Sequence, residues 1–191
     1  MIKANFGCGD NILEGWNNHD IRLDGLDCAE RLPYDCDTVN FILAEHLIEH
    51  MQPHEALFFL DECYRVLKPG GVARIGIPDL DNIKNLDGSY EVFLNIEIAS
   101  EKRVVRSRRD SMRTVMTHWG HKSFWTGPLL EHVLWTVGFE NVIRQEYGKS
   151  EHIELSEIDG HYKKHRLEEL YPGVSAICRK EVTTLEATKG D

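Results

Sequence analysis

The stretch IKANFGCGDN, residues 2–11, sets the fold that the rest of the chain can form. Its apolar run Ile2–Phe6 ends on Gly7, as a buried strand does when it enters a tight turn. Glycines at positions 7 and 9 let a backbone pass close to a ligand, because they carry no Cβ. A nicotinamide-binding G-x-G-x-x-G pattern would need glycine where the chain has Ile12, and an acidic residue further on than Asp20. The turn therefore argues against dinucleotide binding and predicts either another ligand site or a purely structural turn.

Apolar runs of strand length alternate with helical patterns outward from this turn. The nearly continuous run Thr38–Ala44 is typical of a central parallel strand covered on both faces. The alternation predicts an α/β fold with a doubly wound, mostly parallel seven-stranded sheet and a short first helix in residues 10–15. Such sheets bind ligands at the carboxyl ends of their strands. The other predicted strands are Trp16–Ile21, a segment ending at Asp27-Cys28, Val72–Pro78, Asn141–Tyr147 and Val174–Arg179.

Two amphipathic helices are expected between these strands. An apolar stripe of Leu57, Leu60, Tyr64 and Leu67 stops at the Lys-Pro-Gly-Gly of residues 68–71. Thr126, followed by Gly127-Pro128, predicts a capped helix start. That second helix carries the stripe Leu130, Val133, Leu134 and Val137 and should end at Gly138.

Composition bounds the class of protein. The 191 residues fit one domain, expected over residues 1–181 with a flexible tail at 182–191. No apolar run is long enough for a membrane helix and no signal peptide is visible, so a cytoplasmic location is expected. Five scattered cysteines suit reduced thiols. A formal net charge of −10 disfavours nucleic acid as a partner and leaves a small molecule as the expected one. The sequence does not reveal the oligomeric state.

Polar residues fall at successive strand ends. Asp20 lies at the end of the second predicted strand, where a carboxylate can accept hydrogen bonds from ribose hydroxyls. Asp27 and the amide of Cys28 end the third, where they can read an adenine edge. Aspartates often only cap turns, but three ligand-type signals at neighbouring strand ends predict one binding site.

The motifs FGCGDN, HDI, DCAERLPY, LAEHLIEHM and YRVLKPGGVARIGIPD resemble the class I S-adenosylmethionine-dependent methyltransferases. More narrowly, they are similar to a short "predicted methyltransferase" group within that class. The resemblance covers about residues 3–80, and GHKSFWTGPLLEHVLWTVGFENV resembles the later helix and strand of the group. It implies a Rossmann-like methyltransferase fold and S-adenosylmethionine as the cofactor, with S-adenosylhomocysteine as its product.

The resemblance also implies which residues hold the cofactor. Gly7 and Gly9 would line its methionine part, Asp20 its ribose, and Asp27 with Cys28 its adenine. Two positions depart from the class pattern: Asn5 replaces the usual acidic residue, and Asn11 stands at the third glycine position. Asparagine tolerates a left-handed backbone and can still accept a hydrogen bond. The complete predicted set is Asn5, Gly7, Cys8, Gly9, Asp20, Ile21, Asp27, Cys28, Ala44, Glu45 and His46.

Four histidines are candidates for a general base if the acceptor atom is oxygen: His46, His50, His118 and His121. The pattern His46-x-x-Glu49-His50 also matches H-x-x-E-H, which on a helix would place two zinc ligands on one face of a hydrolase. No metal is expected on the methyltransferase interpretation. A module that binds the cofactor without turnover is a third alternative.

Residues 79–122 are too long for an ordinary connection and predict an insertion that covers the substrate site. Ser89–Ala99 could be helical within it. A basic cluster in this segment predicts either a solvated face or a clamp for an acidic acceptor, such as a sugar phosphate. Its members are Lys102, Arg103, Arg106, Arg108, Arg109 and Arg113.

Overall fold

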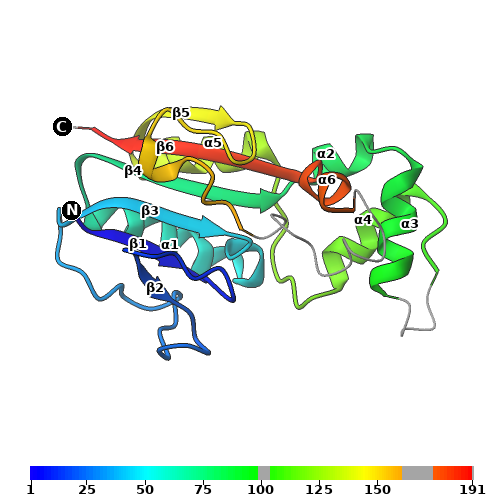
Figure 1. Cartoon of the computed structure of the whole chain (residues 1–191), viewed down its shortest axis with the longest axis horizontal. Coiled ribbons are helices and arrows are strands. Elements are labelled where there is room, and N and C mark those ends of the chain that lie inside the picture. Colours follow the sequence, from blue (N-terminus) through cyan, green and yellow to red (C-terminus); the bar gives the residue numbers. More distant parts are fainter. Residues whose placement is uncertain (99–103, 161–173, 191) are drawn as a thin grey trace.

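The computed structural model describes residues 1–98, 104–160 and 174–190. Six strands form one mixed sheet in the order β2-β1-β3-β4-β6-β5 (Figure 1). The predicted α/β fold is confirmed, with six described strands where seven were expected. Four strands run parallel: β2 (Asn17–His19), β1 (Lys3–Phe6), β3 (Val39–Glu45) and β4 (Leu67–Pro78). Two complete the sheet in antiparallel pairing: β6 (Val182–Lys189) beside β4, and β5 (Phe139–Gln145) beside β6.

The register of the parallel strands builds the ligand edge. Phe6 is paired with His19 on one side and with Ala44 on the other. The residues that follow these three, namely Gly7, Asp20 and Glu45, therefore emerge next to one another. Ligands bind at this carboxyl edge in open parallel sheets.

Helix α1 (Pro53–Val66) packs on the sheet through a stripe that differs from the predicted one. It starts with a capping box in which the Gln52 amide donates to the Glu55 carboxylate at 2.7 Å. Its buried face consists of Ala56, Phe59, Leu60, Glu62, Cys63 and Val66. Leu57 is 46% exposed and Leu67 begins β4, so neither belongs to the stripe. The error has a geometric cause, because the stripe through 59, 60, 63 and 66 leaves position 57 on the outer side.

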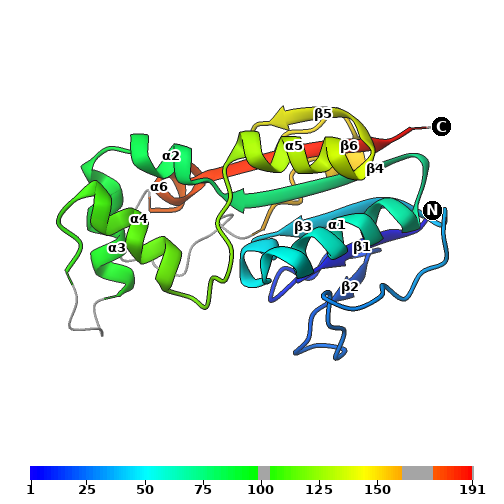
Figure 2. The ribbon, with the colours of Figure 1, turned by 180° about the vertical axis from the view of Figure 1, so that it is seen from behind.

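Helix α5 (Gly127–Val137) agrees with its prediction. The Thr126 hydroxyl accepts from the Leu129 amide at 3.3 Å, and Gly138 ends the helix with φ 117°. Helices α1 and α5 lie on the same face of the sheet (Figure 2). Residues 146–160, with the 3-10 turn η2 (Ile153–Leu155), cover part of the other face, where the rings of His152 and Phe41 are 5.7 Å apart.

The predicted insertion forms a helical lobe beyond the carboxyl ends of the parallel strands (Figure 1). The lobe has a small apolar core of its own, which includes Tyr90, Phe93 and Leu94. Asp79, at the end of β4, joins it to the sheet by accepting from the Gly127 amide and the Thr183 hydroxyl. From the insertion the lobe takes α2 (Leu80–Asn85), α3 (Gly88–Glu97) and α4 (Arg108–Thr117), and from outside the insertion it takes α6 (Val174–Arg179). Helix α3 confirms the prediction for the part of Ser89–Ala99 that is described.

The C-terminal predictions were wrong. Residues 174–179 form α6 rather than a strand, and residues 182–189 of the predicted flexible tail form β6, in the sheet between β4 and β5. Polar residues concealed this strand, since Thr183, Thr184 and Glu186 are all buried in it. The β-branched threonines nevertheless suit a pleated strand.

The segment after β1 is also simpler than predicted. Residues 10–15 form turns instead of a short helix, and no strand ends at Asp27-Cys28. Local polar contacts explain the difference, because Asp24 accepts from the backbone amides of Asp20 and Leu26, each at 3.2 Å. Such turns compete with strand formation.

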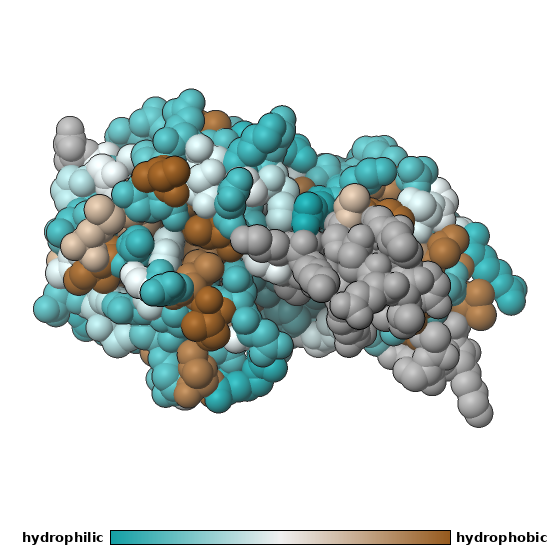
Figure 3. All heavy atoms as spheres, in the orientation of Figure 1, coloured by the Kyte–Doolittle hydropathy of each residue, from teal (hydrophilic) through white to brown (hydrophobic). Residues whose placement is uncertain are grey.

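The face of the molecule in Figure 3 is mostly hydrophilic, and several of its hydrophobic groups adjoin one another in one run. None of the helices in the described ranges combines the length and apolarity needed to cross a membrane. Cys8, Cys28, Cys36 and Cys63 are free thiols, as predicted for them.

Candidate active site

The turn after β1 has the backbone that only glycine adopts easily. Gly7 and Gly9 have φ angles of 63° and 51°. A Cβ on Gly7 would lie 2.7 Å from Cδ1 of Leu47, the side chain that follows β3 across the turn. Position 7 therefore requires glycine for two reasons, conformation and space.

Asn5 is fixed by a local network that only an amide donor completes. Its Nδ2 donates to the Asn11 carbonyl at 2.8 Å and to Asn18 Oδ1 at 3.0 Å. The Asn18 amide cannot turn over freely, because its own Nδ2 donates to the carbonyls of Leu13 and Trp16. A carboxylate at position 5 would face two acceptors. The departure from the class pattern at Asn5 is thus matched by Asn18.

Asp20 is the charged group of the turn. Its Oδ2 accepts from the Gly9 amide at 3.1 Å, and its Oδ1 accepts from the Arg22 backbone and side chain at 2.9 and 3.2 Å. Burial acts to raise the pKa of Asp20, but these hydrogen bonds outweigh it and hold the pKa below its usual range. The group is an anionic acceptor at neutral pH.

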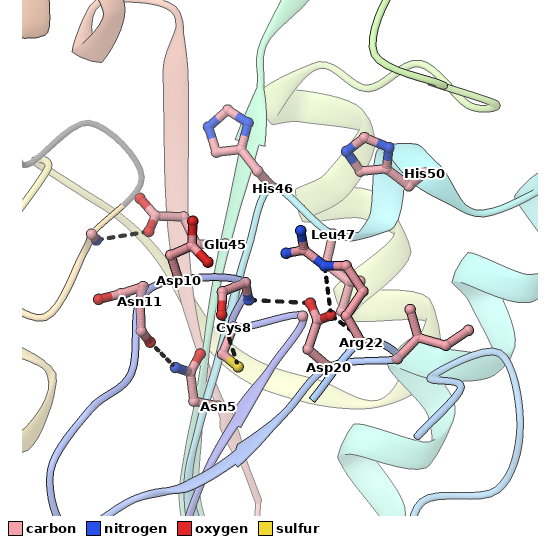
Figure 4. Close-up of a pocket in the computed structure, with 14 residues that line it drawn as sticks. Asn5, Cys8, Asp10, Asn11, Asp20, Arg22, Glu45, His46, Leu47 and His50 are labelled. Atoms are coloured by element: carbon pink, nitrogen blue, oxygen red, sulfur yellow. Dashed lines mark hydrogen bonds and ion pairs between the residues drawn. The ribbon is translucent and has the colours of Figure 1, made fainter. Parts of the chain in front are cut away.

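A cavity of about 760 Å³ opens between this turn and the residues after β3. In Figure 4, Asn5, Cys8 and Asp20 lie on one side of it and His46 and His50 on the other. A second cavity of about 310 Å³ adjoins it, shares Gly7 and Asp20, and is lined also by Asp27 and Cys28. The first is lined by Asn5, Gly7, Cys8, Gly9, Asp10, Asn11, Asp20, Ile21, Arg22, Glu45, His46, Leu47, His50 and Gly160.

The structure brings together all but one of the predicted cofactor residues. Ala44 is 1% exposed within β3 and lines neither cavity. Of the predicted histidines, His46 and His50 line the large cavity, whereas His118 and His121 do not.

The wall of the large cavity opposite the glycine turn, here called the far wall, includes Glu45 and Gly160. It is held by a buried ion cluster that was not predicted from the sequence. Arg74, in β4, is fully buried and contacts the carboxylates of Asp159 and Glu186. These carboxylates raise the pKa of Arg74 against the effect of burial. Asp159 precedes Gly160, whose amide donates to Glu45 at 2.8 Å. A signal was present, since a lone arginine in the apolar run Val72–Pro78 requires buried partners.

The residues after β3 do not form the α-helix that the zinc-hydrolase interpretation of H-x-x-E-H requires. His46 has φ 51°, and only residues Ile48–His50 form a 3-10 turn, η1. His46 and His50 therefore do not share one helix face, and the zinc-hydrolase interpretation of H-x-x-E-H was wrong in its geometry. Burial lowers the pKa of His46 to about 3, so the ring is neutral and a poor general base.

Glu49 is the most deeply buried carboxylate at this turn. It is 1% exposed, and burial raises its pKa. The ring of the neighbouring His50 lies 4.9 Å from that of His121, which returns from the helical lobe. Burial lowers the pKa of His121.

The basic cluster is not assembled on the cavity. Arg108 pairs with Glu91 at 3.3 Å and Arg113 with Asp110 at 3.4 Å, while Arg106 and Arg109 are exposed. Lys102 and Arg103 lie outside the described residues. The basic side chains that do line the two cavities, as far as the chain is described, are Arg22 and Lys122.

Comparison with known proteins agrees with this arrangement. A family model described as a methyltransferase domain matches residues 17–75. The fold is similar to a SAM-dependent methyltransferase from Archaeoglobus fulgidus, with TM-score 0.54 and 17% identity over 98% of this chain and 85% of that one. No curated protein matches the sequence.

Two further solved structures share the fold. One is the complex between the Haloferax volcanii Trm112 methyltransferase activator and a methyltransferase, with TM-score 0.55, 11% identity and coverage of 100% and 83% of the two chains. The other is Haemonchus contortus phosphoethanolamine N-methyltransferase 2 with phosphomonomethylethanolamine and S-adenosylhomocysteine. Its TM-score is 0.52 at 12% identity, with coverage of 100% and 49%.

The sheet order and the glycine turn beside a strand-end carboxylate define a Rossmann-like methyltransferase fold. The stretch of residues 17–75 is similar to a methyltransferase domain, and the fold of the whole chain is similar to that of SAM-dependent methyltransferases.

Proposed function

We propose that the chain is an S-adenosylmethionine-dependent methyltransferase that acts on a small acceptor, with the cofactor held in the 760 Å³ cavity and its adenine in the adjoining 310 Å³ cavity. The observation that carries the proposal is the Gly7–Gly9 turn against the anionic Asp20. This is a cradle that a Cβ at Gly7 would fill and whose carboxylate faces the cavity. S-adenosylmethionine, when bound, supplies a methyl group on a sulfonium; the chain supplies position.

Each part of the two cavities has a role in this proposal. Asn5, Gly7, Cys8 and Gly9 border the methionine part. Asp20 accepts from the ribose, with Ile21 beside it. For this the Arg22 side chain has to release Asp20 Oδ1, which is feasible because that side chain is 71% exposed. Asp27 and Cys28 border the adenine, and Glu45 and His46 lie at the end of β3.

We infer that the acceptor carries an acidic group. Arg22 and Lys122 line the two cavities that this proposal gives to the cofactor, so they act on the acceptor only through the positive charge they add near the site of an otherwise acidic molecule. The Haemonchus contortus enzyme, solved with phosphomonomethylethanolamine, supports the idea that this fold accepts a small phosphate-bearing molecule. We expect the helical lobe to cover the acceptor and to give the acceptor site its shape. The arginine clamp proposed from the sequence has no part in this, because the basic cluster does not line the cavity.

Calorimetric titration with S-adenosylmethionine and S-adenosylhomocysteine tests the cofactor cavity. We expect one-to-one binding that falls about 10- to 100-fold in Asp20→Asn, since a hydrogen bond to a charged acceptor contributes about 1.5–3 kcal/mol. Asp24→Asn is the matched control, because Asp24 contacts His19 and lines neither cavity. Equal affinity in wild type and Asp20→Asn, or no binding by either ligand, would contradict the proposal.

A further inference from the structure

Three side chains that could each coordinate a metal ion converge at the edge of the cofactor cavity. The proposed methyltransferase function gives this group of three no role. One ligand atom each from Glu49, His50 and His121 lies within 4.8 Å of the other two. We propose that these three side chains bind a divalent transition-metal ion, with zinc the ion that the ligand set favours. His46 of the H-x-x-E-H pattern is not a member, so this site differs from the one that the pattern suggested.

The burial of Glu49 supplies independent evidence that a cation binds here. Glu49 is 1% exposed, and within the described part of the chain neither of its carboxylate oxygens accepts a hydrogen bond. His46 Nδ1 lies 3.2 Å from Oε1, without hydrogen-bond geometry. Buried polar groups are nearly always satisfied, and an unsatisfied buried carboxylate is costly. A cation between Glu49, His50 and His121 would satisfy it.

The three side chains are held together by backbone contacts that do not depend on a metal. The Glu49 carbonyl accepts from the amides of Lys122 and Ser123 at 2.7 and 3.1 Å. The Ser123 hydroxyl in turn donates to the Ile48 carbonyl at 3.0 Å. These bonds fix η1 against the segment returning from the helical lobe, so that His121 faces Glu49 and His50 across a stable junction.

The ligand chemistry favours zinc. Two imidazoles and one carboxylate, with a fourth position open, are the ligands of many catalytic zinc sites, whereas magnesium prefers oxygen ligands. Zinc bonds of about 2.0–2.2 Å would require the ligand atoms to close to roughly 3.4 Å, a shift on the order of an ångström for the half-buried histidines.

The open position would face the reaction site. His50 lines both cavities, whereas Glu49 closes the buried side. An ion there is placed to hold an oxygen of the acceptor beside the cofactor. The role in holding the acceptor rests on the proposed function, whereas the binding of the metal does not.

Zinc titration of the metal-stripped, tag-free full chain tests the site. We expect one-to-one binding by calorimetry and a rise in the melting temperature on addition of zinc, because a ligand that binds only the folded state stabilises it. Glu49→Gln and His121→Asn should each weaken zinc binding by more than about tenfold and abolish the melting shift. His132→Ala, an exposed histidine on α5, should behave as wild type.

The possible outcomes separate the two proposals. No saturable zinc binding, or equal binding in wild type and His121→Asn, would overturn the metal site; His121 is only half buried, so this variant should fold even if Glu49→Gln does not. S-adenosylhomocysteine is titrated into the same metal-free samples. If the wild-type chain binds zinc but not S-adenosylhomocysteine, only the proposed cofactor cavity is contradicted. If it binds S-adenosylhomocysteine but not zinc, only the metal site is contradicted.

Discussion

The two walls of the cofactor cavity are held by contacts of very different range. The wall at the glycine turn depends mainly on neighbours in the sequence, Asn5 with Asn11 and Asn18 and Asp20 with Gly9, with one distant contact from Asn11 Nδ2 to the Ile158 carbonyl at 3.2 Å. The far wall depends on distant ones, because Glu45 is reached by Gly160, 115 residues away. The comparison shows that ligand contacts can be encoded locally while the enclosure and the buried charges depend on the complete fold.

Replacing Arg74 tests the long-range wall with the largest expected effect. Arg74→Met leaves Asp159 and Glu186 buried without their cation. Breaking a buried ion cluster in this way lowers the free energy of unfolding by about 3–5 kcal/mol. Urea denaturation measures it, with Arg22→Ala as the control, whose exposed side chain should contribute less than about 0.5 kcal/mol. Equal losses in both variants would mean that the cluster does not hold the far wall.

Glu181, a second buried group held by long-range contacts, makes the stability of the folded state depend on pH. Burial, with a contribution from the charge of Glu49, raises the pKa of Glu181 to about 8, and the Tyr90 hydroxyl donates to it. The folded state then binds one proton more than the unfolded state between the ordinary glutamate pKa and 8. The stabilisation from this proton is complete below the pKa that Glu181 has in the unfolded state. It is lost as the pH rises through the pKa of Glu181 in the folded state.

Denaturation at several pH values measures this effect. Between pH 5 and pH 9, wild type should lose on the order of 3 kcal/mol relative to Glu181→Gln, which cannot ionise. Parallel stability curves for the two proteins would show that Glu181 ionises normally.

A pair of glycine variants separates conformation from space in the local wall. Gly7→Ala incurs both a positive φ and contact with Leu47, and should cost about 2–3 kcal/mol. Gly15→Ala has a φ of 74° with nothing nearby, so it should cost about 1–2 kcal/mol. Gly7→Ala should also weaken S-adenosylhomocysteine binding, with partial recovery in the double variant with Leu47→Ala. Identical effects at positions 7 and 15 would remove the steric argument.

The smallest expected effect concerns Asn5. Asn5→Asp restores the acidic residue usual in the class but loses the donation to Asn11 and Asn18. We expect a loss of about 1–3 kcal/mol in stability and no gain in cofactor affinity. A variant of wild-type stability that binds S-adenosylmethionine more tightly would show that the Asn18 network does not determine residue 5.

Some of the fold and site followed from the sequence alone. The glycine turn, Asp20 after β2, the strand Val39–Glu45 and the capped helix after Thr126 were each predicted from neighbouring residues. They could be predicted because turn conformation, capping and apolar runs depend on local chemistry. The resemblance to class I methyltransferases was carried by the same part of the sequence.

Only the tertiary structure decided the rest. A strand as polar as Val182–Lys189 is stable because it is paired on both sides, and Arg74 is tolerated because Asp159 and Glu186 meet it from distant segments. The meeting of Glu49 and His50 with His121 likewise depends on the path of the helical lobe back to the sheet. Burial and long-range pairing set the free energy of each of these groups, and the neighbouring residues in the chain do not identify the distant partners.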